Sequence, residues 1–332
     1  MNRMTCLNKK KKFRIWMKLS AAALALSLIV LTGCGKGASL PAGKKSEKGY
    51  SLPEIMIIAM TEKNRYEEIC TDQIWNVTIS DEQEDFASYL TGQIKNFMEE
   101  LKIMNLLAED KKMTLSPEER SRMAAAASEY YGNLTSEDIS HMGVTEEDVR
   151  TVFEDYCMAE KLVEALTEGI ALEVSDSEAK VITLMQAETS DRQAAENLVI
   201  AASQENANFE KSAEDAGLSV TTRQLGRKEE DQGFEDAAFE LTSGQVSQVI
   251  ESDGTYYVLK CVSDYDEEAT AARKKVIFEE RKRKAFREIY DRFKEEVNLT
   301  YPGDPWNKLD LGSGSYAAGA DFFEIYRKHS GQ

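Results

Sequence analysis

The sequence predicts an α+β protein, in which a mostly helical domain is built from both ends of the chain and a small sheet domain is inserted between them. Apolar residues recur every three or four positions over residues 81–173 and again over 266–297, which is typical of helices packed on one face. Between these segments, β-branched runs alternate with short helical ones. A chain of 332 residues is long enough for two domains of about 150 residues each.

The first 33 residues are predicted to be an export signal. Residues 1–18 hold seven basic side chains and no acidic one, and residues 19–33 form an apolar run too short to span a membrane. The run ends in Leu31, Thr32, Gly33 and Cys34, which resembles the lipobox of bacterial lipoproteins. The resemblance implies that the Cys34 thiol is acylated and that residues 1–33 are removed. We expect a lipid anchor on the extracytoplasmic side of a cell membrane, in a Gram-positive bacterium.

The segment that follows, residues 34–50, is predicted to be the lipidated cysteine and a flexible tether. Its residues are mostly small, polar or basic (CGKGASLPAGKKSEKGY), a composition that favours a flexible chain. Sixteen extended residues reach about 50 Å. The protein is therefore expected to work near a membrane surface without being embedded in it.

Charge and composition exclude several classes of function. Loss of the seven basic residues of the signal takes the formal charge from −18 to −25, so nucleic acid is not an expected partner. The chain has only two histidines, His141 and His329, and Cys70, Cys157 and Cys261 are far apart. Neither a metal site nor a disulfide framework is indicated, and no cofactor is expected.

Residues 51–173 are predicted to form the helical N-terminal domain. Residues 54–60 (EIMIIAM) and 73–79 (QIWNVTI) are interpreted as short strands because they are apolar and β-prone. A helix is predicted over 81–110, where apolar residues recur at helical spacing. A capping residue followed by an acidic or amide side chain three positions later marks four helix starts, at Ser80, Ser116, Thr145 and Ser175.

Residues 174–265 are predicted to form the small sheet domain. Strands are expected over 180–186 (KVITLMQ), 221–225 and 255–262 (TYYVLKCV), and helices over 191–216 and 233–241. Residues 266–311 are expected to return to the helical domain as one long helix that docks on it, followed by an extended segment with Trp306 buried. In the tail, residues 312–332, Phe322, Phe323 and Tyr326 are predicted to form a short docking helix, and His329 to be solvated.

The sheet domain carries a family resemblance. Gln224, Leu225 and Gly226, followed by FEDAAF, SGQVS and GTYYVLKCV, resemble the second half of a parvulin-type peptidyl-prolyl isomerase domain. With the lipobox, the helical domain and the long return helix, the whole chain resembles extracytoplasmic foldases of the PrsA and SurA type. The resemblance implies a chaperone domain, completed by the return helix, that carries an inserted parvulin-like domain.

The same resemblance implies a degenerate active site. Leu225 matches the leucine and Phe234 the phenylalanine that grip the prolyl ring in parvulins. Of the two pocket histidines, one falls at Tyr257 and the other at Val181 or Gln186, so neither is present. The pocket methionine and cysteine are also missing. Gln186, Leu225, Phe234 and Tyr257 are therefore expected positions of a degenerate pocket rather than assigned catalytic residues, and Phe234 is equally well explained as core.

Three functions follow from these features. The first is a membrane-anchored foldase that binds unfolded exported polypeptides and has weak or no prolyl isomerase activity. The second is an active isomerase with a site that uses no histidine. The third is a solute-binding lipoprotein of a transporter, which would need two lobes of repeated strand–helix units. Flexible methionines suit a client-binding surface, and the helical domain has eight, which ordinary packing also explains: Met56, Met60, Met98, Met104, Met113, Met123, Met142 and Met158. The sequence does not indicate clients or an oligomeric state.

Overall fold

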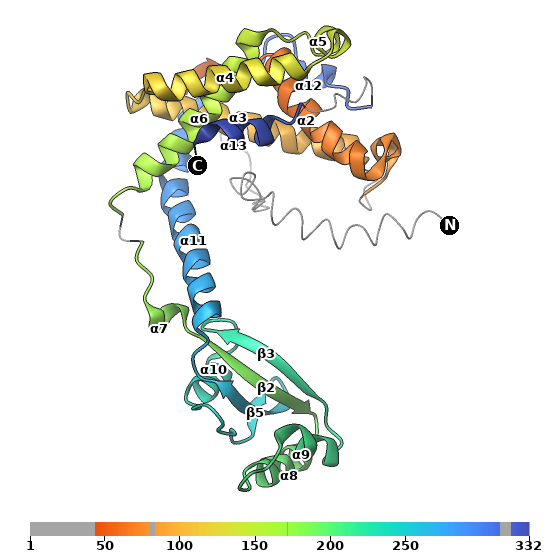
Figure 1. Cartoon of the computed structure of the whole chain (residues 1–332), viewed down its shortest axis with the longest axis vertical. Coiled ribbons are helices and arrows are strands. Elements are labelled where there is room, and N and C mark those ends of the chain that lie inside the picture. The colour runs from red at the N-terminus through yellow and green to blue at the C-terminus, as the bar shows by residue number, and fades with distance from the viewer. Residues whose placement is uncertain (1–43, 80–83, 171, 313–319, 332) are drawn as a thin grey trace. The chain divides into compact units, whose positions relative to one another are not determined.

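The computed structural model describes residues 44–79, 84–170, 172–312 and 320–331 (Figure 1). The export signal, Cys34 and the predicted cap at Ser80 lie outside these residues. The described residues divide into two compact units, one formed by those up to 168 together with those from 285 onward, the other by those between 169 and 284. The first unit is helical and draws on both ends of the chain, and the second is a small α+β unit, so the predicted fold class is confirmed. No helix in the described ranges is both long and apolar enough to cross a bilayer.

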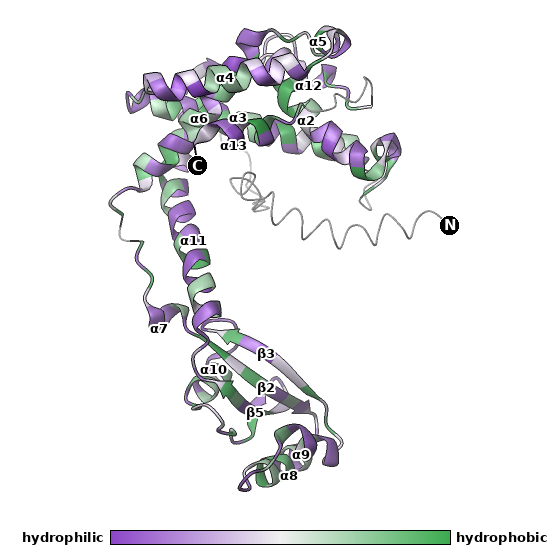
Figure 2. Cartoon of the chain, in the orientation of Figure 1, coloured by the Kyte–Doolittle hydropathy of each residue, from purple (hydrophilic) through white to green (hydrophobic). Residues whose placement is uncertain are grey.

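The helical unit is an assembly of amphipathic helices around one core. Its long helices are α2 (Leu52–Cys70), α3 (Phe86–Asp110), α4 (Pro117–Asn133) and α6 (Glu146–Thr167), with the shorter α5 (Ser136–Met142) between α4 and α6. Hydrophilic and hydrophobic residues mix along α3, α4 and α6 in Figure 2, as expected for helices with one buried face. The second half of α11 (Glu267–Lys294) joins this core through Phe286 and Tyr290, and Arg287 reaches Glu100 at 2.7 Å.

The two strands predicted near the start of this unit are wrong. Residues 54–60 lie inside helix α2, which begins with a capping box in which the Glu54 carboxylate accepts hydrogen bonds from the backbone and hydroxyl of Ser51 (both 2.7 Å). Pro53 lies in the first turn, where its missing N–H costs nothing. Residues 73–79 contain the 3₁₀ helix η1 (Asp72–Asn76) and, at Thr78, a single bridge to Asp85.

The other start signals have different outcomes. Ser116 and Thr145 do cap α4 and α6, each in a reciprocal capping box, and Ser175 caps the short α7 (Asp176–Ala179). Helix α3 begins five residues later than predicted, at Phe86, because the Asp85 carboxylate accepts a hydrogen bond from the Ser88 N–H (2.7 Å). Capping side chains thus set most of these boundaries.

Part of the predicted tether belongs to the folded unit. Residues Lys45–Lys48 form strand β1, which pairs in parallel with β6 (Val297–Thr300). Tyr50 is buried and donates a hydrogen bond to the Asp155 carboxylate of α6 at 2.6 Å. Expected flexibility is therefore corrected for residues 45–50, because strand pairing and burial fix them.

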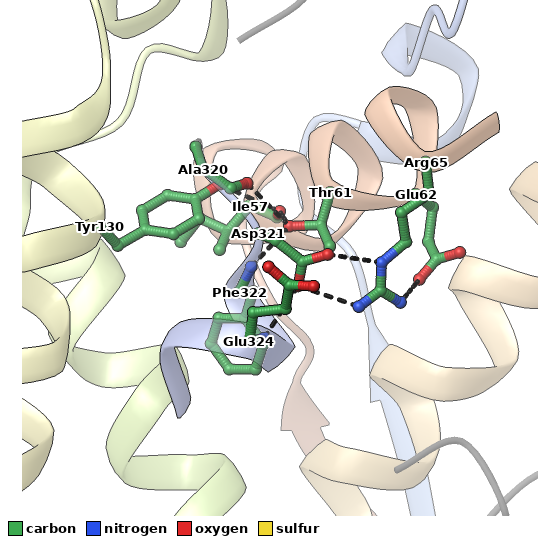
Figure 3. Close-up of polar contacts among 9 residues, drawn as sticks. All are labelled: Ile57, Thr61, Glu62, Arg65, Tyr130, Ala320, Asp321, Phe322 and Glu324. Atoms are coloured by element: carbon green, nitrogen blue, oxygen red, sulfur yellow. Dashed lines mark hydrogen bonds and ion pairs between the residues drawn. The ribbon is translucent and has the colours of Figure 1, made fainter. Parts of the chain in front are cut away.

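The C-terminal tail closes the helical unit through α13 (Phe322–Ser330), as predicted from Phe322, Phe323 and Tyr326, all of which are buried. Figure 3 shows its attachment to α2: the Phe322 N–H donates to the Thr61 hydroxyl (3.1 Å) and Arg65 contacts Asp321. His329 was predicted to be solvated, but its Nε2 lies 2.7 Å from the Glu129 carboxylate, because α13 packs on α4.

The segment between α11 and α13 also differs from the expected extended chain. It contains β6 and the short helix α12 (Pro305–Lys308), which Asp304 caps. Trp306 is only half-buried, although its indole nitrogen is enclosed.

The α+β unit contains one four-stranded antiparallel sheet in the order β3-β2-β5-β4. Its strands are β2 (Val181–Thr189), β3 (Val220–Gly226), β4 (Ile250–Ser252) and β5 (Thr255–Ser263). Helix α10 (Gln232–Phe239) packs on one face, and α8 (Arg192–Ala202) and α9 (Phe209–Asp215) pack on the other. The single helix predicted over 191–216 is wrong, because Asn208 caps a separate α9. Neither described unit is a lobe of parallel strand–helix repeats, which argues against a solute-binding protein.

Candidate functional site

The four predicted pocket positions lie on one face of the sheet, which we call the α10 face. The register pairs Leu225 with Ile182, Leu259 with Gln186 and Tyr257 with Glu188. Paired residues of an antiparallel ladder point to the same side, and so do residues two apart on one strand. Gln186, Leu225 and Tyr257 therefore share this face, and Phe234 of α10 packs onto it.

Leu225 and Phe234 form part of the core beneath α10. Leu225 is 0% and Phe234 3% exposed, and both belong to one apolar cluster with Leu184 and Leu259. The Phe234 N–H also donates to the Asp231 carboxylate at 3.0 Å, which caps α10. In this structure the two side chains support the sheet from within and do not line an open slot.

Tyr257 lies at the margin of this cluster. Its ring is half-buried and meets the Phe234 ring edge to face, with centroids 5.3 Å apart and planes at 88°. Edge-to-face packing of this kind fixes the orientation of an aromatic ring. The ring of Tyr257 is thus partly accessible at the surface of the α10 face, while the ring of Phe234 is part of the core.

Gln186 is buried beside the exposed Glu188. Its side-chain Nε2 donates to the Glu188 carboxylate at 3.2 Å, and its Oε1 is buried with no hydrogen-bond partner within the described ranges. A glutamine in this position cannot exchange a proton as an imidazole does. Glu188 was not among the positions predicted from the sequence, although the two-residue period of a strand places it on the same face as Gln186.

The charged loop between β3 and α10 has a fixed hydrogen-bond pattern. The Glu235 carboxylate accepts from the backbone N–H groups of Glu229 (2.7 Å) and Glu230 (3.3 Å), and the Glu229 carboxylate accepts from the Gly226 N–H at 3.0 Å. Arg273 of α11 donates to the Glu229 carboxylate and to the Arg227 carbonyl. The resemblance puts the pocket methionine in this charged loop. Arg273 was not predicted because it lies far away in the sequence.

The methionines of the helical unit do not form a client surface. Six of the eight are buried, and the remaining two are half-buried (buried: Met56, Met60, Met98, Met104, Met123 and Met142; half-buried: Met113 and Met158). A cavity between α3 and α6, next to Tyr156, has a volume of about 10 Å³, which is room for about one water molecule. These methionines are therefore core residues.

The described cysteines form no metal site, and two of them are unreactive in character. Cys70, Cys157 and Cys261 form no disulfide, and burial raises the pKa of Cys157 and Cys261 above the usual value. Among the described residues no three metal-ligating side chains converge.

Comparison with known families gives a match in the α+β unit, which we call the sheet unit. Residues 172–274 match the family model described as the PPIC-type PPIASE domain. No curated protein matches the chain. The prediction of a parvulin-type domain within the chain is confirmed by the family match.

Solved structures to which the chain is similar include foldases and chaperones. The foldase PrsA of Streptococcus pneumoniae is 18% identical, with 69% of this chain and 97% of that chain covered and a TM-score of 0.25. A peptidylprolyl isomerase (PrsA) of Bacillus cereus is 17% identical, with 75% and 97% covered and a TM-score of 0.32. A structure from the study of two SurA-like chaperones of Campylobacter jejuni is 16% identical, with 70% and 94% covered and a TM-score of 0.25.

Proposed function

We propose that this chain is a lipid-anchored foldase that assists exported polypeptides outside the cell. The observation that carries the proposal is the match of residues 172–274 to the PPIC-type PPIASE domain. It is supported by the basic and apolar N-terminus that ends at Cys34 and by the names of the similar structures, which are foldases and SurA-like chaperones. Its clients are unfolded or partly folded proteins.

The isomerase activity of the sheet unit is proposed to be weak or absent. Rotation about a peptide bond has a barrier of about 18–20 kcal/mol, and X-Pro bonds isomerise in tens to hundreds of seconds without help. A catalyst needs an apolar slot for the proline ring and polar groups that favour the twisted amide. The resemblance puts Tyr257 at one histidine position and Val181 or Gln186 at the other, and Leu225 and Phe234 are already buried in the core.

One observation favours the alternative of an active isomerase. The Tyr257 ring is fixed against Phe234 and lies at the edge of the α10 face, so its hydroxyl is available to a bound peptide as a hydrogen-bond donor. Substitution of Tyr257 by Phe removes this hydroxyl while the ring packing stays. A turnover of a proline-containing peptide that falls in the Tyr257→Phe variant would establish the alternative.

The proposal is tested with the soluble chain that begins at Gly35. We expect it to suppress the aggregation of an unfolded client protein at stoichiometric concentration, and to accelerate prolyl isomerisation little or not at all. Suppression without turnover supports the foldase with a degenerate site. Loss of both activities would overturn the proposed function.

Anchoring is tested separately in cells, with the full chain. Wild-type protein is expected in the membrane fraction. The Cys34→Ala variant is expected either to be released without detergent or to keep its signal uncleaved. Two acyl chains hold a protein stably at a bilayer because each buried methylene contributes about 0.8 kcal/mol. Metabolic labelling with a fatty acid in wild type and not in Cys34→Ala would identify the modified residue.

A further inference from the structure

The open end of the α10 face combines a carboxylate with an aromatic ring. Glu188 on β2 is the cross-strand partner of Tyr257 on β5, so their side chains leave the sheet on the same side and as direct neighbours. Glu188 is exposed and Tyr257 is half-buried. A carboxylate beside the face or edge of a tyrosine is suited to a lysine or arginine side chain, through ion pairing and cation–π attraction.

Three other charged groups around this face already have partners. Arg223 lies 2.6 Å from Glu230, and the Asp231 carboxylate accepts from the Ser252 hydroxyl at 2.7 Å. The Glu235 carboxylate is engaged by the backbone of the β3–α10 loop. Within the described ranges no ion pair involves Glu188, and its contact is with the neutral amide of Gln186. Glu188 is thus a charge on this face that lacks a cation.

The buried amide of Gln186 orients this carboxylate. Gln186 is 9% exposed, and its Nε2 donates to Glu188 at 3.2 Å. Its Oε1 is buried and has no partner in the described part of the chain. A buried acceptor without a donor is unfavourable, so the amide is held in this orientation by its bond to Glu188. The site therefore presents an exposed carboxylate whose position is fixed by a buried neighbour.

We infer that Glu188, oriented by Gln186, makes the sheet unit select client segments that carry a lysine or arginine next to the residue seated on Tyr257. The inference rests on the proposed function, because it assumes that client segments bind at the α10 face. It identifies the substrate class as basic segments, in keeping with the acidic charge of the mature chain. Gln186 acts as a positioning residue and Glu188 as the specificity-determining one.

Three fluorescent peptides that differ only in the residue before a proline (lysine, alanine or glutamate) test the inference with the soluble chain from Gly35. At low salt the lysine peptide is expected to bind up to about fivefold tighter than the alanine peptide, which is the upper end of the range for an exposed ion pair. The glutamate peptide is expected to bind less tightly than both. The preference is expected to shrink at high salt, because exposed charges are screened.

Variants separate specificity from binding. Glu188→Gln is expected to bind all three peptides with the affinity of the wild type for the alanine peptide. Gln186→Met is expected to reduce the ratio of lysine-peptide to alanine-peptide affinity. The control is Glu251→Gln, which should keep the preference for the lysine peptide. The exposed Glu251 side chain lies near Arg192, and Arg192 lies over the ring of Tyr256 in the cluster on the opposite face of the sheet.

The outcomes distinguish this inference from the proposal beneath it. Equal binding of the three peptides by the wild type, or a lysine preference that survives in Glu188→Gln, would overturn the inference and leave the client-binding role intact. If none of the three peptides binds, client binding at the α10 face is overturned, and the inference with it.

Discussion

Arg65 of α2 donates two hydrogen bonds to the carboxylate of Asp321, which lies 256 residues later in the chain (Figure 3). Its Nε lies 2.6 Å from Oδ2 and its Nη2 2.9 Å from Oδ1, while Nη1 contacts Glu62 at 3.0 Å. The guanidinium also lies 5.0 Å from the centre of the Phe323 ring. The side chain that caps α13 is therefore fixed to the first long helix, and the two ends of the chain fold as one unit.

Substitution of Asp321 by Asn is expected to destabilise the helical unit. Asparagine still caps a helix well, so the change mainly removes the ion pair and leaves Arg65, 25% exposed, with Glu62 alone. A loss of about 1–3 kcal/mol in the free energy of unfolding is expected for a partly buried, bidentate pair. In the mature chain both tryptophans, Trp75 and Trp306, belong to this unit, so urea unfolding followed by tryptophan fluorescence reports it.

The control for this prediction is Glu147→Gln, which breaks the exposed pair with Arg150 at 2.6 Å. Ion pairs at such positions contribute about 0–0.5 kcal/mol. If both variants unfold at the same urea concentration as the wild type, the Arg65–Asp321 contact does not stabilise the protein.

Substitution of Phe322 by Ala is expected to have a larger effect. Its ring is 0% exposed and its centroid lies 4.3 Å from that of Phe153. Removal of a fully buried phenylalanine costs about 3–5 kcal/mol, because contacts are lost and a cavity remains. The matched control is Phe278→Ala, where the ring is 40% exposed, with an expected loss below about 1 kcal/mol. A similar shift of thermal unfolding in both variants would contradict the assignment of α13 to the core.

The sequence predicted helices well where one face only is buried, and failed where burial is more complete. Residues 55–60 are all nearly inaccessible, so the run has no polar positions to reveal a helical period, and a short apolar run is ambiguous between strand and buried helix. The start signal was nevertheless present, because Ser51 and Glu54 have the spacing of Ser116 and Glu119. Contacts such as β1 with β6 depend on the whole fold and leave no local pattern.

The candidate site was predictable in its placement but not in its burial. Strand predictions with a two-residue period place Gln186 and Tyr257 near one another on one face. Whether Leu225 and Phe234 line a slot or fill a core depends on how α10 packs, and that is determined by Asp231, Glu235 and the distant Arg273. Residues chosen by alignment therefore identified the face and missed the charges around it.

The pH dependence of stability is expected to involve Glu160. Burial raises the pKa of its carboxyl above the ordinary value, and the hydrogen bond from the Tyr326 hydroxyl (2.6 Å) opposes this less strongly. A carboxyl whose pKa is raised on folding contributes stability that is fully present below the unfolded-state pKa of about 4.3 and is lost as pH rises through the folded-state pKa. Wild type should therefore lose this contribution between mildly acidic and neutral pH.

Two variants test the sign of this effect. Glu160→Gln cannot ionise, so its free energy of unfolding relative to wild type should rise as pH increases from about 4 to 7. Tyr326→Phe removes the bond that lowers the pKa of Glu160, so the decline of stability with pH should become steeper than in the wild type. Urea unfolding at a series of pH values measures both slopes, and parallel curves for all three proteins would contradict the prediction.

A side chain at Gly226, at the end of β3, is expected to displace Arg273. A methyl group there would meet the guanidinium of Arg273, which donates to Glu229 and to the Arg227 carbonyl. Displacement of Arg273 breaks these bonds and loosens the loop between Leu225 and Phe234, so Gly226→Ala should destabilise the sheet unit by about 1–2 kcal/mol.

Gly92 in α3 offers the matched control, because it is exposed and has open space at the Cβ position. Alanine there should stabilise the helical unit by about 0.5–1 kcal/mol through helix propensity. Amide hydrogen exchange of β2 and β3 measures the first variant, since the sheet unit has no tryptophan. Exchange should accelerate in Gly226→Ala and remain unchanged in Gly92→Ala. Unchanged protection in both variants would mean that the hydrogen bonds of Arg273 to Glu229 and Arg227 do not stabilise the sheet unit.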